Sequence, residues 1–305
     1  MAEVFLYTVS MELKGIYAGK PATFQLLLLL LCLLLGGIFS SLIGTGGLYL
    51  LYGAYSNPMQ HPETMRLMQL ISAIGTFLFP SLAVAWLCSL APKEYLWIKK
   101  SPSNKILLLV FASMFLISPA ITLTALLNKQ MVLPSFMAPV ENWMKAQEAL
   151  AEQLTNTLLA GDGLMNILAN LLVIAAVAGI TEEFLFRGAL QRIIGKWTSN
   201  HHIVIWTAAI IFSAFHMQFY GFLPRMLLGA YFGYLLYWSR NIWIPVFAHF
   251  VNNAFAVISM SDARLKENEF ITGEISDTNL LPYSALAVVT LLLFYLCIQQ
   301  IRRML

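Results

Sequence analysis

The chain contains repeated apolar runs of about the length that crosses a lipid bilayer, and this feature restricts its fold more than any other. Of its 305 residues, 59% are hydrophobic and only 11% are charged. A helix needs about 20 apolar residues to cross the hydrocarbon core, and lipid leaves backbone polar groups no partner outside the chain. We therefore expect an all-α polytopic membrane protein with about eight transmembrane helices in one bundle, forming a single integral membrane domain over residues 1–305. The expected spans are 24–51, 65–90, 106–127, 164–186, 203–216, 222–238, 243–260 and 282–298.

The Lys and Arg residues between these spans predict the orientation, because cytoplasmic loops carry the excess of positive charge. With a cytoplasmic N-terminus, twelve of the 18 Lys and Arg residues face the cytoplasm and six face the other side. The twelve are Lys14, Lys20, Lys93, Lys99, Lys100, Lys105, Arg187, Arg192, Lys196, Arg240, Arg302 and Arg303. The six are Arg66, Lys129, Lys145, Arg225, Arg264 and Lys266. We expect both termini in the cytoplasm, and the small net charge of +3 gives no support to nucleic-acid binding.

Two further segments have predicted structures. Residues 139–162 place apolar side chains at helical spacing beside charged ones, which predicts an amphipathic helix on the outer surface or, equally, a solvated connector. The first span contains a group of glycines, for which close helix packing is the better explanation than a phosphate-binding loop. These glycines are Gly36, Gly37, Gly44, Gly46 and Gly47.

A few polar side chains interrupt the apolar spans, where such groups are costly and often functional. They are Glu182, Glu183, Arg187, His216, His249 and Asn253. Any one of them taken alone could be a simple hydrogen bond between helices. Their spacing and depth therefore decide whether they form a site.

Helical geometry separates the roles of these residues. Glu183 and Arg187 are four apart and share a face, so they can form an ion pair. Glu182 lies about 100° around the helix and cannot share that arginine, which leaves its carboxylate free for chemistry. His249 and Asn253 are also four apart and can offer two N–H donors to one point, as an oxyanion hole requires.

Counting residues from the turns places these groups at one depth. Glu182 and His216 are equally far from an expected turn near Ser199, so they should meet if the two helices are antiparallel. Asn253 lies at a similar depth when counted from the turn near Arg240. This coincidence favours a single functional site built from three helices.

The polar residues also form motifs that resemble a known family. The stretch TEEFLFRGALQ resembles an EExxxR motif, FSAFH at 212–216 an FxxxH motif, and HFVNN at 249–253 an HxxxN motif. The three together, in this order, are similar to the CPBP (Abi) intramembrane proteases, which include CAAX prenyl proteases of the Rce1 type and bacteriocin-processing or immunity proteins. The resemblance covers residues 167–258, within an expected protease core at 164–260.

The resemblance implies peptide-bond hydrolysis inside a membrane, here expected to be the bacterial inner (plasma) membrane. It implies that Glu182 is the catalytic carboxylate, that Glu183 and Arg187 support it as an ion pair, and that His216 holds or polarises water. His249 and Asn253 are expected to stabilise the oxyanion. The expected partners are membrane lipid and a protein or peptide substrate, with lipidated and bacteriocin-like peptides as candidates.

Three alternatives stay open at this point. Glu182, His216 and His249 are a legitimate set of three zinc ligands with an open fourth position, although no HExxH motif is present. We favour metal-free attack by water activated by Glu182, with no cofactor. A non-catalytic membrane scaffold or immunity protein would keep the motifs for helix packing, and a proton-coupled transporter is a weaker alternative because the polar groups gather at one depth.

Overall fold

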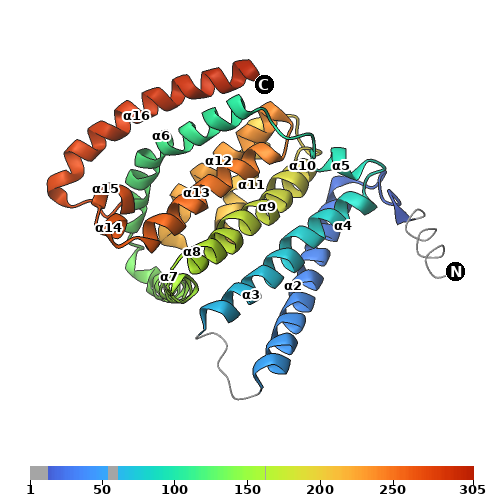
Figure 1. Cartoon of the computed structure of the whole chain (residues 1–305). Coiled ribbons are helices and arrows are strands. Elements are labelled where there is room, and N and C mark those ends of the chain that lie inside the picture. Colours follow the sequence, from blue (N-terminus) through green and yellow to red (C-terminus); the bar gives the residue numbers. More distant parts are fainter. Residues whose placement is uncertain (1–12, 54–60, 162) are drawn as a thin grey trace.

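The computed structural model describes residues 13–53, 61–161 and 163–305. Within these ranges the chain is helical and contains no β-strand, which confirms the predicted fold class. The helical segments are α2 (Ala22–Tyr52), α3 (Pro62–Ala73), η2 (Ile74–Leu78), α4 (Phe79–Leu87), α5 (Pro92–Tyr95), α6 (Asn104–Lys129), η3 (Ser135–Met137), α7 (Ala138–Leu159), α8 (Leu164–Asn170), η4 (Leu171–Val177), α9 (Ala178–Glu183), η5 (Phe184–Leu190), α10 (Gln191–Ile194), α11 (His201–Phe215), η6 (Phe219–Gly221), α12 (Phe222–Ser239), α13 (Trp243–Ser261), α14 (Ala263–Lys266), α15 (Glu269–Thr272) and α16 (Asp277–Met304), most of which are labelled in Figure 1.

All eight segments expected to cross the membrane are helical over most of their length, and the second ends three residues early, at Leu87. Within the described ranges, six helices are long and apolar enough to span a bilayer: Ala22–Leu51, Pro62–Leu87, Asn104–Lys129, Leu164–Ile194, Trp243–Ser261 and Asp277–Met304. Of the other two, α11 is only 15 residues long, and α12 carries Arg225 and three tyrosines that lower its apolar content. The chain is thus a polytopic membrane protein, while the count of eight spans stays a prediction.

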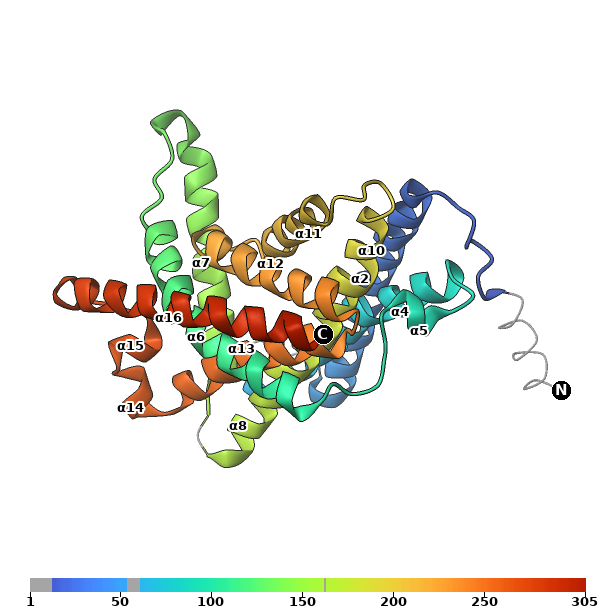
Figure 2. The same ribbon diagram turned by 90° about the horizontal axis from the view of Figure 1, so that it is seen from above.

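The central helices are held by apolar cores on both sides. One core joins α2, α4 and α5 to η5, α10 and α11, with Leu29, Val84 and Phe186 among its buried members. A second joins α6, α12, α13 and α16. Figures 1 and 2 accordingly show α9 to α13 between the α2–α4 hairpin on one side and the α6–α16 pair on the other. Close van der Waals packing from both sides fixes the central helices that carry the polar motifs.

Close packing between α2 and the α3–η2 helix depends on small residues. A Cβ added to Gly36 would lie 2.1 Å from the carbonyl oxygen of Gly75, so only glycine allows this approach. Gly44 is similarly restricted by Met68. The prediction of close packing is wrong for Gly46, because a Cβ there would meet nothing within 4 Å, and the same holds for its neighbour Gly47.

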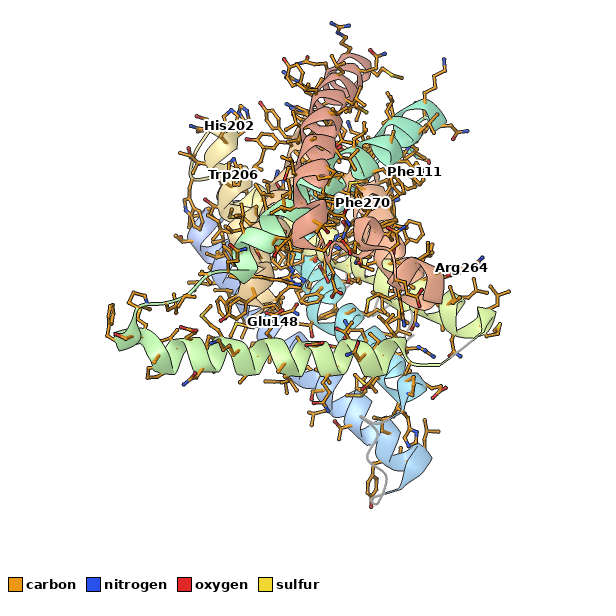
Figure 3. The ribbon with its side chains drawn as sticks, turned by 90° about the vertical axis from the view of Figure 1, so that its left-hand side faces the viewer. Phe111, Glu148, His202, Trp206, Arg264 and Phe270 are labelled. Carbon is orange, nitrogen blue, oxygen red and sulfur yellow. The ribbon has the colours of Figure 1, made fainter. Side chains whose placement is uncertain are left out.

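The segment expected to be an amphipathic helix or a solvated connector forms α7. Figure 3 shows α7 lying crosswise to the helices around it. The helix is anchored by buried Met144 and by Trp143, whose ring centroid lies 5.3 Å from that of Phe219. These contacts favour the helix over the connector, and its position on the membrane surface stays a prediction.

Candidate active site

The Glu182 side chain lies on a helix that changes its hydrogen-bond pattern twice. The continuous helix from Leu164 to Ile194 contains two π-helical stretches, η4 and η5, which flank the six-residue α9. π-helical turns are rare and are often found at functional sites. Gly179 on α9 allows α13 to approach closely, because a Cβ there would lie 3.3 Å from the backbone nitrogen of Phe250. This approach brings the histidine of α13 to the two glutamates.

Glu183 and Arg187 form the ion pair that their spacing predicts. The Nη1 atom of Arg187 lies 2.8 Å from Oε1 of Glu183, and both side chains are essentially inaccessible. Nη2 donates to the carbonyl of Gly229 at 2.9 Å. The guanidinium also lies 4.4 Å from the ring centroid of Phe212. A buried charge pair needs such additional partners to offset desolvation, so Arg187 is fixed between α9, η5, α11 and α12.

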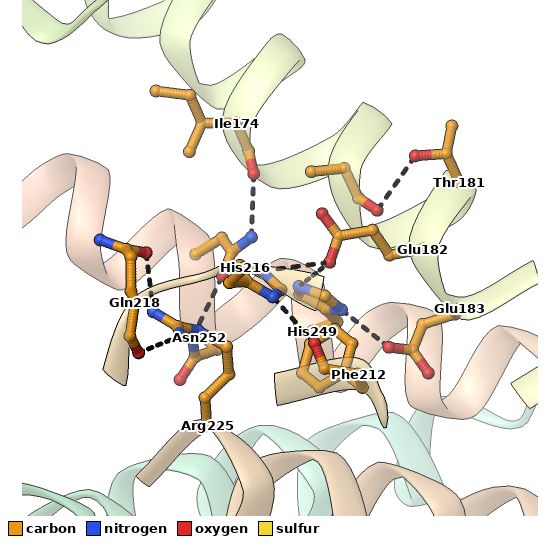
Figure 4. Close-up of polar contacts among 12 residues, drawn as sticks. Ile174, Thr181, Glu182, Glu183, Phe212, His216, Gln218, Arg225, His249 and Asn252 are labelled. Carbon is orange, nitrogen blue, oxygen red and sulfur yellow. Dashed lines mark hydrogen bonds and ion pairs between the residues drawn. The ribbon is translucent and has the colours of Figure 1, made fainter. Parts of the chain in front are cut away.

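His249 links the ion pair to Glu182. Its Nδ1 atom lies 2.8 Å from Oε1 of Glu183, and its ring stacks on Phe232 with centroids 5.2 Å apart. Because an ionised carboxylate only accepts hydrogen bonds, Nδ1–H must be the donor. The neutral imidazole then presents an unprotonated Nε2, which lies 3.8 Å from Oε2 of Glu182 (Figure 4).

His216 reaches the same carboxylate from α11. Its Nδ1 atom lies 3.0 Å from the carbonyl oxygen of Phe212, which can only accept, so Nδ1–H is again the donor. Its Nε2 lies 3.9 Å from Oε2 of Glu182 (Figure 4). That oxygen is buried and makes no hydrogen bond within the described part of the chain. Three acceptor atoms from three helices therefore converge: Oε2 of Glu182, Nε2 of His216 and Nε2 of His249. Counting residues from the turn near Ser199 also brought Glu182 and His216 to the same depth.

Asn253, the remaining motif residue, is partly committed to the backbone. Its Nδ2 donates to the carbonyl of Ile174 in η4 at 2.9 Å, and its Oδ1 accepts from Asn252 at 3.1 Å. One amide hydrogen therefore remains for another acceptor. His249 can act as the second expected N–H donor only as the imidazolium, because Nε2 of the neutral ring carries no proton.

The zinc hypothesis can be compared with the spacing of its three expected ligands. Zinc binds carboxylate oxygen and imidazole nitrogen at about 2.0–2.2 Å, so two ligand atoms in a tetrahedral site lie about 3.3 Å apart. The separations of 3.8 and 3.9 Å from Glu182 to His249 and His216 are wider. Across the described residues, no three His, Cys, Asp or Glu side chains are arranged to hold a metal ion. The atoms are of the right kind, but their spacing does not fit.

Arg225 is the polar residue near this site that the sequence reasoning missed, because it was counted among the charges of the outer side although it lies within the expected span 222–238. It lies in the first turn of α12 and donates from Nη2 to Oε1 of Gln218 at 2.9 Å. In the ranges that the structure describes, Arg225 makes no ion pair with a carboxylate within 4.0 Å. Figure 4 shows it on the same side of the site as Asn252 and His216. An arginine within an apolar run was the signal that could have revealed it.

Comparison with known proteins finds a family model that matches the segment carrying these motifs. Residues 164–255 match the family model described as type II CAAX prenyl endopeptidase Rce1-like. We call residues 164–255 the Rce1-like segment, because the similarity covers these residues and not the rest of the chain. The Rce1-like segment ends close to the predicted limit at residue 258 and contains Glu182, His216, His249 and Asn253. The boundaries of a separate core at 164–260 stay a prediction.

A curated relative and the solved structures add little to this assignment. Over 89 residues, the chain is 29% identical to the uncharacterized protein YpbD of Bacillus subtilis (strain 168). This stretch covers 28% of the present chain and 42% of YpbD, so the chain spans less than half the length of that relative. No solved structure matches the chain significantly. The Rce1-like match thus indicates a protease.

Proposed function

We propose that this protein is an intramembrane endopeptidase in which Glu182 activates water to hydrolyse a peptide bond in a membrane-associated protein or peptide. The observation that carries the proposal is the convergence of Oε2 of Glu182 with Nε2 of His216 and of His249, at 3.9 and 3.8 Å. A water molecule at this point could donate to two of the three acceptors. The Rce1-like segment supports peptide hydrolysis over other uses of the same groups.

The proposed reaction begins when Glu182 takes a proton from the bound water. The water oxygen attacks the scissile carbonyl carbon and the carbonyl oxygen becomes an oxyanion. The free amide hydrogen of Asn253 stabilises that charge, and Nε2–H of His249 joins it once Glu182 has passed the water proton to this ring. Glu183 accepts from Nδ1–H of His249 and thereby orients the ring.

The tetrahedral intermediate collapses by breaking the carbon–nitrogen bond. The leaving amine takes the proton that Glu182 received from water, with His216 as a second route for proton transfer. The products are one carboxylate and one amine, so atoms and protons balance. No covalent acyl-enzyme is required, and the reaction uses no group outside the chain and its water.

The test is cleavage of a fluorogenic library of membrane peptides by the purified protein in detergent. Glu182→Gln should lower turnover by about 10²–10⁴-fold, the usual contribution of a general base. Glu152→Gln is the matched control, because it makes the same change at an exposed position on α7. Thermal unfolding of each variant separates loss of chemistry from loss of folding.

Three results would count against the proposal. Full cleavage by a folded Glu182→Gln variant would show that Glu182 is not the general base. Loss of cleavage on chelation, with recovery on adding zinc, would instead favour the zinc-dependent protease that the spacing does not support. Absence of cleavage by the wild-type protein across the library would favour the non-catalytic scaffold or immunity protein.

A further inference from the structure

A polar cavity lies at the C-terminal end of the continuous helix Leu164–Ile194, away from Glu182. It has a volume of about 410 Å³ and lies between the α10–α11 connection, the C-terminal end of α12 and the loop after α5. The cavity is lined by Trp97, Arg187, Gln191, Arg192, Gly195, Lys196, Thr198, Ser199, His201, Val204, Ile205, Leu236, Tyr237 and Arg240. The lining includes four Lys or Arg side chains and no carboxylate, so the cavity is strongly positive.

Three of these cations are not neutralised by a nearby acid. Arg192 donates from Nη1 to the backbone carbonyls of Glu94 and Tyr95, each at 3.0 Å. Lys196 donates from Nζ to the neutral side chain of Gln25 at 2.7 Å. Within the described ranges, neither these two nor Arg240 forms an ion pair. The carboxylate of Glu94 is in electrostatic range of Arg192, but it is exposed on α5 and does not line the cavity.

Aromatic rings hold these cations in place. The Arg192 guanidinium lies 4.8 Å from the ring centroid of Tyr95 and 5.0 Å from that of Trp97. The guanidinium of Arg240 lies 5.7 Å from the centroid of Trp97. Stacking of this kind restricts side chains that would otherwise move freely in water. The positive groups are therefore arranged before any ligand arrives.

The inner wall of the cavity combines apolar surface with one unused acceptor. Gln191 is only 8% exposed, and its Oε1 is buried with no hydrogen-bond partner among the described residues, while its Nε2 donates to the carbonyl of Gly233. Because a buried acceptor without a partner costs free energy, a rotation of this amide that brings Oε1 to a ligand hydroxyl in the cavity would be favoured. Buried Val204, Ile205 and Leu236 form the apolar part of the lining.

The location suits a lipid headgroup. The cavity contains the connection between two membrane helices on the side to which the Lys and Arg distribution assigns the cytoplasm. Basic pockets between helices on that side attract anionic headgroups. We propose that this cavity binds the phosphate of an anionic phospholipid whose headgroup also carries a hydroxyl, as phosphatidylglycerol does. The cations take the phosphate, Gln191 accepts from the hydroxyl, and the apolar wall contacts the glycerol end of the lipid. This proposal does not depend on the proteolytic activity.

The experiment measures lipid binding to the full-length protein by native mass spectrometry from detergent. The probes are phosphatidylglycerol, phosphatidic acid, neutral phosphatidylcholine and inorganic phosphate, each titrated alone, and inorganic phosphate is also titrated against bound phosphatidylglycerol. Wild-type protein should bind phosphatidylglycerol at least tenfold more tightly than phosphatidylcholine. The double variant Lys196→Gln/Arg240→Gln should bind phosphatidylglycerol about 30-fold more weakly, since each basic residue near an anionic surface contributes about 1 kcal/mol, or roughly fivefold.

The matched control is Lys99→Gln/Lys100→Gln, which removes two exposed charges from the same expected side of the membrane without touching the cavity lining. Retention of wild-type affinity by this control supports a defined site. Equal weakening in both double variants would show general attraction of an anionic lipid to a basic surface and would overturn the proposal. So would saturation by inorganic phosphate that displaces phosphatidylglycerol, which would identify a free phosphate site.

Gln191→Leu provides a second variant, expected to reduce the preference for phosphatidylglycerol over phosphatidic acid, which lacks the headgroup glycerol and its hydroxyls.

Discussion

Replacement of Arg187 by methionine should greatly destabilise the fold, because it would leave the carboxylate of Glu183 buried without its cation. Both side chains are almost inaccessible, and the guanidinium makes two hydrogen bonds, at 2.8 and 2.9 Å. Removing one partner of a buried ion pair costs about 3–5 kcal/mol. Two hydrogen bonds from a charged group, at about 1.5–3 kcal/mol each, give a similar total. We therefore expect Arg187→Met to lower the free energy of unfolding by about 4 kcal/mol.

The double variant separates the ion pair from simple loss of packing. In Glu183→Gln/Arg187→Met no charge remains buried, and the glutamine oxygen can still accept from Nδ1–H of His249. We expect the double variant to be about 1–2 kcal/mol more stable than Arg187→Met alone, because the unpaired carboxylate is the costly feature. Arg303→Met, on an exposed residue of α16, serves as the control and should change stability by less than about 0.5 kcal/mol.

Unfolding can be followed in mixed micelles of mild detergent and sodium dodecyl sulfate. The thiol of Cys88 is 4% exposed in the folded protein, so its reaction with a dye reports loss of packing. A cost of less than about 1 kcal/mol for Arg187→Met would contradict the role of the ion pair in stability. A double variant that is less stable than Arg187→Met by the full cost of Glu183→Gln alone would contradict it as well.

Three further predictions concern other parts of the fold. Gly36→Ala should destabilise the protein by about 1–3 kcal/mol through overpacking, whereas Gly46→Ala, which meets open space, should be nearly neutral in the same unfolding titration. Tyr231→Phe should cost about 1 kcal/mol there, because its hydroxyl makes a buried 2.6 Å hydrogen bond to a serine on α6. Hydrogen bonds led by that from the Ser276 N–H lower the pKa of Glu269 below its usual 4.5. That hydrogen bond should therefore be fully present above pH 4.5 and lost as the pH falls through the lower folded pKa. Hydrogen exchange of the Ser276 amide, corrected for its intrinsic rate, should become faster over that pH range in the wild-type protein. The Glu269→Gln variant should show no such transition.

The sequence was sufficient for the parts of this protein that depend on local spacing. Apolar runs of about 20 residues predict helices because lipid leaves no other way to satisfy the backbone. The four-residue interval between Glu183 and Arg187 predicts their ion pair, since it is a property of one helix. Counting from the turn near Ser199 brings Glu182 to His216 because both helices rise by the same distance per residue.

Features that depend on contacts between distant segments were not predictable in this way. The protonated nitrogen of His249 follows from its contact with Glu183, which is 66 residues away in sequence. The commitment of Asn253 to Ile174 depends on a carbonyl in a π-helical turn, and no residue pattern indicated that turn. Arg225 was counted among the charges of the outer side because it lies at the start of the expected span 222–238, and that position does not reveal its electrostatic interaction with Glu182 in another helix.

The limited access to Glu182 restricts the conformation in which a substrate can be cut. Its side chain is only 14% exposed, whereas that of His216 is 29% exposed, so the site is more open on the His216 side. An intact substrate helix is about 10 Å wide and its carbonyls are already hydrogen-bonded, so it cannot present a carbonyl carbon to the recessed carboxylate. Under the proposed function, the scissile segment must therefore unwind first. Glycine or proline near the cleavage site lowers that cost by about 1 or 3 kcal/mol per residue, so the rate of cleavage should depend on local helix stability as much as on side-chain identity.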